Sequence, residues 1–194
     1  MPKISDARRE QRRAQIIDAA LSCFTRTSYQ RTTMADIIAE SGLSAGAIYG
    51  YYASKQELLL AVAETILGER RAELVAATGE GDLSPAGIVA TIARGVRVTA
   101  PFQVLIQVWG EATVDPSLRE LVHTVLGHLR STIGAALENW ATRHPEAVAL
   151  PPQDWARRAT PVVMALLPGF IVQSALVDDF NAEAFLTDIG LVLP

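Results

Sequence analysis

Several side chains between residues 31 and 55 can form hydrogen bonds or ion pairs with a polyanion. The hydroxyl groups belong to Ser44, Tyr49 and Tyr51, and the cations are Arg31 and Lys55. Phenol and serine hydroxyls can reach phosphate oxygens or base edges, and an ammonium group pairs with phosphate. The chemistry that this set predicts is therefore noncovalent contact.

A second chemistry is indicated by residues 42–46, G-L-S-A-G, which match the G-x-S-x-G pattern around the nucleophile of serine hydrolases. That nucleophile requires a strand before it. The residues before Ser44 have helical spacing instead, and no parallel-sheet pattern exists to bring His123, His128 or His144 to it. A helical enzyme using Ser44 is an alternative, but we expect no enzymatic activity.

The histidines and the lone cysteine give no metal-binding pattern. His123 and His128 are five residues apart, so they do not share a helix face as residues i and i+4 would. Cys23 has no partner for a disulfide, and residues 1–15 lack the apolar core of a signal peptide. We expect no metal, no cofactor and a cytoplasmic location.

Two short helices joined by a tight turn position the polar groups described above. Thr33 is a good N-cap, and Asp36 stands three residues later, where its carboxylate can complete a capping box. Gly42 ends this helix because glycine takes the left-handed conformation without strain. Ser44 then caps a second helix over residues 45–51. This arrangement is typical of a helix-turn-helix, whose second helix lies in the DNA major groove.

Residues 16–63 resemble the TetR family of transcriptional regulators. The most diagnostic piece is I-Y-G-Y-Y-A-S-K-Q-E-L-L, residues 48–59, and the specific motif covers about a quarter of the chain. The remainder matches as an all-helical regulatory domain. Two positions depart from the family pattern. Ser28 stands where a glycine is usual before the aromatic Tyr29, and Gly50 stands where a larger residue is common.

The resemblance implies that residues 45–51 form the helix that reads DNA. Because alanine and glycine carry no hydrogen-bonding side chain, we expect little direct base readout and more dependence on phosphate contacts and DNA shape. Lys55 is expected at a phosphate, and Thr33 is expected to offer its backbone amide there. The DNA-contacting residues that the resemblance implies are Arg31, Thr33, Ser44, Ala45, Gly46, Ala47, Tyr49, Tyr51 and Lys55.

The whole chain reads as all-α, since apolar residues recur at helical spacing and no strand-like alternation is found. We expect a three-helix DNA-binding head in residues 1–55 and a larger helical domain for effector binding and dimerisation in residues 56–194. A flexible break is expected at residues 78–82. Besides the two short helices, the predicted helices cover residues 8–26, 54–77, 84–99, 101–109, 116–140, 154–177 and a last segment after Asn181.

The net charge of −4 is unevenly divided. Residues 1–55 hold eight Lys/Arg and five Asp/Glu, a balance of +3, whereas residues 56–194 hold nine and sixteen, a balance of −7. Phosphate attracts the first segment and repels the second. We therefore expect residues 1–55, the head, to be the part of the protein that binds DNA. Five basic residues precede or begin the first helix as a candidate phosphate-binding arm: Lys3, Arg8, Arg9, Arg12 and Arg13.

The segment from Ala159 to Val177 carries no charged residue over nineteen positions, which is long enough to cross a membrane. A membrane-associated or adaptor protein is therefore another alternative. Pro161, Pro168 and Gly169 argue against a membrane span. The resemblance implies instead that this helix and the last one form a homodimer interface, and we expect no membrane partner.

The resemblance also implies a small-molecule effector that releases a dimeric repressor from a palindromic DNA operator. The abundance of apolar residues among the candidates favours a hydrophobic ligand. For any single residue, a plain core role is the alternative. The candidate ligand-binding residues are Phe102, Ile106, Gln107, Trp109, His123, Leu126, Phe170 and Gln173.

Overall fold

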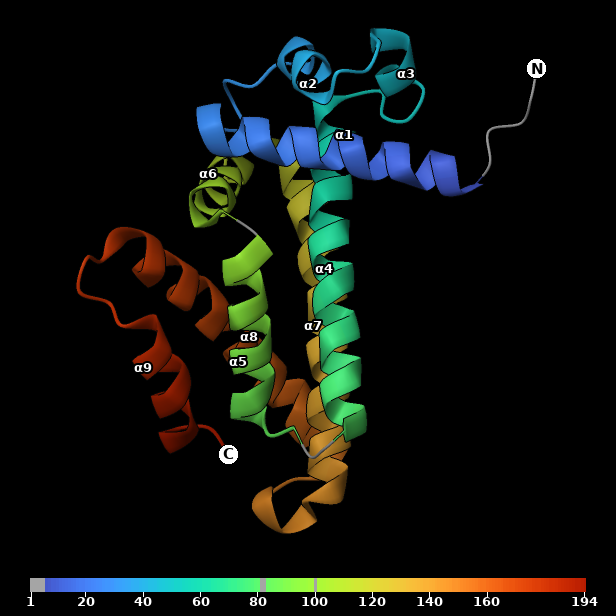
Figure 1. Ribbon diagram of the computed structural model, residues 1–194. Coiled ribbons are helices and arrows are strands. Elements are labelled where there is room, and N and C mark those ends of the chain that lie inside the picture. Colours follow the sequence, from blue (N-terminus) through green and yellow to red (C-terminus); the bar gives the residue numbers. More distant parts are fainter. Residues whose placement is uncertain (1–5, 81–82, 100) are drawn as a thin grey trace. The chain divides into compact units, whose positions relative to one another are not determined.

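The computed structural model describes residues 6–80, 83–99 and 101–194, and over these the chain is helical with no strand (Figure 1). This confirms the all-α prediction. The helices are α1 (Asp6–Thr27), α2 (Met34–Ser41), α3 (Ala45–Tyr49), α4 (Lys55–Glu80), α5 (Pro85–Thr99), α6 (Phe102–Ala112), α7 (Pro116–Arg143), α8 (Pro152–Leu176) and α9 (Ala182–Asp188), with 3-10 turns at Pro145–Ala147 and Ile189–Leu191.

The caps predicted for the two short helices are present. The Thr33 hydroxyl accepts a hydrogen bond from the Asp36 amide at 3.2 Å, and the Asp36 carboxylate accepts one from the Thr33 amide at 2.8 Å. Gly42 ends α2 with φ at +66°, in the left-handed region. The Ser44 hydroxyl accepts from the Ala47 amide at 3.3 Å and begins α3. These bonds satisfy backbone groups that short helices leave open at their ends.

The helix boundaries that differ in an informative way from the prediction are those of α3, α4 and α8. α3 ends at Tyr49 instead of residue 51, so Gly50 lies at its end rather than in its middle. α4 continues through Gly79 to Glu80, because one glycine in a helix costs only about 1 kcal/mol relative to alanine. The rest of the expected break, residues 81–82, lies outside the described residues. α8 begins at Pro152, since proline is favoured in the first turn of a helix.

One compact unit, which we call the head unit, contains the described residues up to Thr65 together with Gln103–Leu121. α1, α2 and α3 pack around a small apolar core. The fully buried side chains in this core include Ile16, Phe24, Ile37, Ile48 and Leu58. The compact unit also takes in most of α6 and the first residues of α7, so the functional boundary at residue 55 stays a prediction.

The second compact unit, the body unit, contains the described parts of Ile66–Phe102 and Val122–Pro194. In it, α5 packs against both α8 and α9. Phe170 is fully buried, and its ring centroid lies 5.6 to 6.0 Å from those of Phe102, Phe180 and Phe185. The Ala86 amide donates to the carbonyl of Pro194 at 3.1 Å, which fixes the chain end beside the start of α5.

Candidate nucleic-acid interface

The outward face of α3 is small and mostly without hydrogen-bonding side chains. Ile48 is completely buried and anchors the helix, whereas Tyr49 next to it keeps 50% of its surface exposed. Ala45 and Gly46 are also exposed, and Ala47 and Tyr51 are partly so. This face offers a methyl group, bare backbone and a phenol to a ligand. It fits thymine methyl contact and phosphate contact better than a dense set of base hydrogen bonds.

Ser44 lies in a turn between two helices. Its side chain is exposed and its oxygen accepts from the Ala47 amide, which is the role of an N-cap. Because α2 precedes this turn, the strand-to-helix geometry of a hydrolase nucleophile is not present around Ser44.

Thr33 is exposed, but its backbone amide is not available as we expected. That amide donates to the Asp36 carboxylate at 2.8 Å, and the Thr33 hydroxyl contacts the same oxygen at 2.7 Å. The carboxylate lies where a phosphate oxygen would have to bind. The sequence already contained the reason, since a capping box uses the N-cap amide.

Lys55 differs most from its predicted position. Its ammonium group turns inward and donates to three backbone carbonyl oxygens in the turn between α1 and α2. It also lies 4.4 Å from the centroid of the Tyr29 ring. Burial lowers the pKa of Lys55, whereas carbonyl acceptors favour its charged form. The group is therefore already satisfied within the protein instead of being free for a phosphate.

Other residues of the head carry exposed positive charge. Arg31 is exposed, and its backbone amide makes only a long bond of 3.4 Å to the Ser28 hydroxyl. On α1, Arg8, Arg9 and Arg13 are exposed and Arg12 is partly exposed, whereas Lys3 lies outside the described residues. These arginines are the cations best placed to contribute sequence-independent attraction to DNA.

Ser28 explains one departure from the expected pattern. Its φ is +80°, in the left-handed region where glycine is favoured and other residues are strained by about 1–2 kcal/mol. The turn is retained because its backbone is bonded on both sides. The Ser28 amide donates to the Phe24 carbonyl at 3.0 Å, and the Thr32 hydroxyl donates to the Ser28 carbonyl at 2.7 Å.

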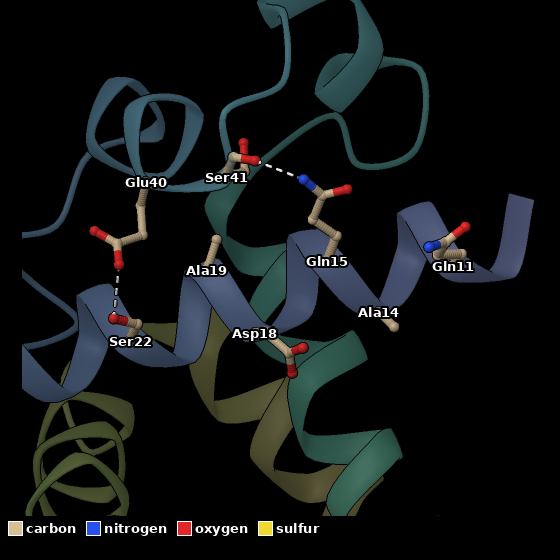
Figure 2. A pocket seen from close by; sticks show the side chains of 8 residues that line it. All are labelled: Gln11, Ala14, Gln15, Asp18, Ala19, Ser22, Glu40 and Ser41. Carbon is tan, nitrogen blue, oxygen red and sulfur yellow. Dashed lines mark hydrogen bonds between the residues drawn. The ribbon is translucent and has the colours of Figure 1, made fainter. Parts of the chain in front are cut away.

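An open groove of about 630 Å³ runs between α1 and α2, as Figure 2 shows. Two hydrogen bonds cross it: Gln15 Nε2 donates to the Ser41 carbonyl at 2.8 Å, and the Ser22 hydroxyl donates to Glu40 at 3.0 Å. Glu40 also pairs with Arg26 at 2.9 Å. The groove is therefore a polar seam that joins the two helices, and it contains none of the predicted ligand-binding residues.

The predicted ligand-binding residues do not lie in one compact unit. Ile106, Gln107 and Trp109 belong to the head unit, while the other five belong to the body unit. Within the body unit, Phe102 and Phe170 are in ring contact, but His123 and Gln173 are exposed. The sequence reasoning also missed Phe180 and Phe185, which complete the aromatic cluster around Phe170. Both follow the long uncharged segment in the sequence, and this position was the one signal that could have indicated them.

The comparisons with known proteins agree with the geometry of the head. The family model for bacterial regulatory proteins of the tetR family matches residues 16–62. The HTH-type transcriptional regulator BetI of Paraburkholderia phymatum is 30% identical over 192 residues, which cover 96% of this chain and 92% of that protein. The chain belongs to the tetR family. It is thus a DNA-binding transcriptional regulator.

Two solved structures share the fold of this TetR-family regulator along nearly the whole chain. The regulator FadR of Bacillus subtilis in complex with stearoyl-CoA has a TM-score of 0.69 at 16% identity, covering 93% of this chain and 97% of that one. A transcriptional regulator of Saccharomonospora viridis in complex with choline has a TM-score of 0.64 at 19% identity, covering 93% and 94%.

Proposed function

We propose that this regulator is a cytoplasmic homodimeric repressor that binds a palindromic operator and leaves it when a small apolar ligand binds the body unit. The outward face of α3 is the main support for the proposed binding to DNA. Tyr49 is 50% exposed on a capped turn while its neighbour Ile48 is fully buried. A helix anchored on one side and bare on the other is suited to enter a major groove.

The homodimer is supported by exposed apolar side chains on α8. Val162, Val172 and Leu176 are 60%, 39% and 68% exposed, and their spacing brings them to one side of the helix. Leu191 and Val192, after α9, are 84% and 79% exposed. Such a surface needs a cover, and a second copy provides one of matching character.

The same helix gives the membrane alternative its support. By length and composition α8 could cross a bilayer, with a mean hydropathy of 1.7 over its best window and 28% of that window buried. Two prolines, Pro161 and Pro168, lie inside it. A dimer interface accounts for the exposed side chains without requiring insertion, and it leaves α3 free to reach DNA.

The apolar effector is supported by the aromatic cluster of the body unit. Phe102, Phe180 and Phe185 surround Phe170, and all three are only partly buried. Apolar and aromatic side chains are the usual lining of ligand sites. The stearoyl-CoA and choline complexes show that regulators of this fold hold ligands with acyl chains or with methylated ammonium groups. We favour the acyl chain because the cluster around Phe170 is purely hydrocarbon.

The regulatory mechanism is a shift between two dimer populations. Two copies of α3 must lie about one DNA turn apart, ~34 Å, to bind two half-sites together. A ligand can bind more tightly to a dimer in which the two α3 helices have another spacing. The affinity of the protein for the operator then falls by an amount set by the difference between the ligand's affinities for the two dimer states.

A selection from random-sequence duplexes tests the DNA-binding part. We expect the wild-type protein to enrich a palindromic sequence. Tyr49→Ala should then lower affinity for that duplex by about 10-fold, because one contact to a base edge or phosphate is worth about 1–2 kcal/mol. Two matched variants each remove one exposed positive charge: Arg31→Ala removes it from the head, and Arg157→Ala removes it from α8. Only Arg31→Ala should weaken DNA binding. Equal affinities for all three variants and the wild type would contradict the assignment of the interface.

The dimer is tested separately. Val162→Asp and Leu176→Asp place a charge on the exposed side of α8, whereas Val98→Asp changes a side chain that is 84% exposed elsewhere in the body unit. Sedimentation equilibrium should show monomers for the first two variants and dimers for the third. Dimers in all three cases would contradict the α8 interface.

A further inference from the structure

The ammonium group of Lys55 has a complete set of partners inside the head unit. It donates to the carbonyls of Tyr29 at 2.8 Å, Thr32 at 2.9 Å and Gln30 at 3.2 Å. An ammonium group has three donors, so all of them are used. The Tyr29 ring, 4.4 Å from the nitrogen, adds a cation–π contact.

These three carbonyls belong to the strained turn that joins α1 to α2. The turn contains Ser28 with its left-handed backbone and is held by hydroxyl bonds of Thr32, which is only 1% exposed. Thr27 and Thr32 also share a hydrogen bond of 2.8 Å. The cation of Lys55 neutralises the partial negative charge of carbonyl groups that converge on one point.

Lys55 is also the first residue of α4 and closely follows the end of α3. The segment between them is tied to α3, since the amides of Tyr51 and Tyr52 both donate to the Ile48 carbonyl at 2.9 Å. The cation thus joins the exit of the reading helix to the turn from which α2 starts, 23 to 26 residues earlier in the chain. Both ends of the helix-turn-helix are fixed by one side chain.

We propose that Lys55 is a positioning residue for DNA recognition: its ammonium group fixes the α1–α2 turn against the start of α4, and so holds α3 at the angle that specific binding requires, without contacting phosphate. This inference rests on the proposed DNA-binding function. A lysine that moved to a phosphate would leave three converging carbonyl groups without their donor.

The test compares specific with non-specific binding. The specific probe is the duplex that the wild-type protein enriches from random sequences, and the non-specific probe is a scrambled duplex of equal length and composition. Lys55→Met removes the charge and keeps an unbranched stem. Lys55→Arg keeps the charge, but a planar guanidinium cannot direct donors to three carbonyls around one nitrogen. Arg31→Ala is the control for loss of an exposed charge.

Lys55→Met and Lys55→Arg should each lower affinity for the enriched duplex by about 10-fold or more. Affinity for the scrambled duplex, and the slope of log affinity against log salt concentration, should stay at the wild-type values. Non-specific binding depends on phosphate charge and tolerates small changes in helix angle. Arg31→Ala should weaken both duplexes and reduce the salt slope by about 1. Thermal unfolding of each variant fixes an assay temperature at which all of them are folded.

Three results would overturn the inference. The first is that Lys55→Met binds both duplexes more weakly, to an equal degree and with a smaller salt slope, while Lys55→Arg binds normally. This result would show that Lys55 contacts a phosphate. Lower melting temperatures with unchanged affinities would show a role in stability only. If Lys55→Met does not fold, normal specific binding by folded Lys55→Arg contradicts the positioning role by itself. A selection that enriches no duplex contradicts the proposed function itself, which separates that failure from the three results above.

Discussion

In the head unit, helices of 8 and 5 residues are held by side-chain caps and by one partly buried cation, Lys55, whereas in the body unit the 25-residue α8 relies on apolar packing. The caps are local and polar: Thr33 with Asp36, Ser44 with Ala47, and Gly42 in a left-handed conformation. The body unit instead centres on contacts among phenylalanine rings from α6, α8, α9 and the segment before α9.

The difference fits the proposed separation of DNA recognition from ligand response. Isolated helices of 5 to 8 residues are unstable in water, so the head requires directional bonds that leave α3 in one orientation. Apolar packing among long helices is non-directional and allows more than one arrangement of similar free energy. We infer that the rigid unit reads DNA and that the more adaptable unit receives the ligand and the second copy.

The largest effect is expected in the body core. Phe170 is fully buried against three other rings, so Phe170→Ala should lower the free energy of unfolding by about 3–5 kcal/mol. Val98→Ala, at a position 84% exposed, should change it by less than about 0.5 kcal/mol. Chemical denaturation measures both. Similar losses for the two variants would show that the aromatic cluster is not the centre of the body core.

A smaller loss is expected from the cap of α2. Thr33→Ala removes the hydroxyl that accepts from the Asp36 amide and should cost about 1–2 kcal/mol. Thr142→Ala is the matched control, because its exposed hydroxyl only donates to the Glu138 carbonyl within α7. Hydrogen exchange of α2 amides reports the change locally. Unchanged protection in Thr33→Ala would mean that packing, rather than the cap, holds α2.

Ser28→Gly should stabilise the head. Glycine relieves a left-handed strain of about 1–2 kcal/mol but loses more backbone entropy on folding, so the net gain is about 0.5–1 kcal/mol. A rise in melting temperature would show this gain. A fall would mean that the bond from the Arg31 amide to the Ser28 hydroxyl matters more than the strain.

The smallest effect concerns acid stability. Bonds from the Thr33 hydroxyl and then the Thr33 amide hold the pKa of Asp36 below its ordinary value of 3.8. A carboxylate with a lowered pKa stabilises the fold above its ordinary pKa, and this stability is lost as the pH falls through the lowered value. Melting curves should therefore show a component lost below pH 3.8 in the wild type and missing in Asp36→Asn. Identical pH profiles would contradict it.

The sequence predicted the head well because its determinants are close together in the chain. The caps at Thr33 and Ser44 each use an amide three residues later, so the residue types alone indicate them, as they do for Asn181 in the body unit. The inward position of Lys55 was not predicted, because its hydrogen-bond partners are 23 to 26 residues away in the chain. Lys55 turns inward because the turn between α1 and α2 presents its carbonyl groups to it. The residues next to Lys55 in the sequence do not specify the conformation of that turn.

The candidate ligand-binding residues are spread over both compact units, for a related reason. Phe102 and Phe170 were recognised from apolar spacing, and they are in ring contact. Spacing on one helix does not tell which neighbouring helix covers it, so Ile106, Gln107 and Trp109 were assigned to a set whose other members lie in the body unit. The effector-binding role of these residues is still a prediction.

A hydroxyl-radical footprint of the protein on its selected duplex tests whether two copies of α3 bind together. We expect two protected stretches on one side of the DNA, centred about one helical turn apart, ~34 Å, with protection lost at both in Tyr49→Ala. A single protected stretch, or protection that persists in Tyr49→Ala, would contradict it.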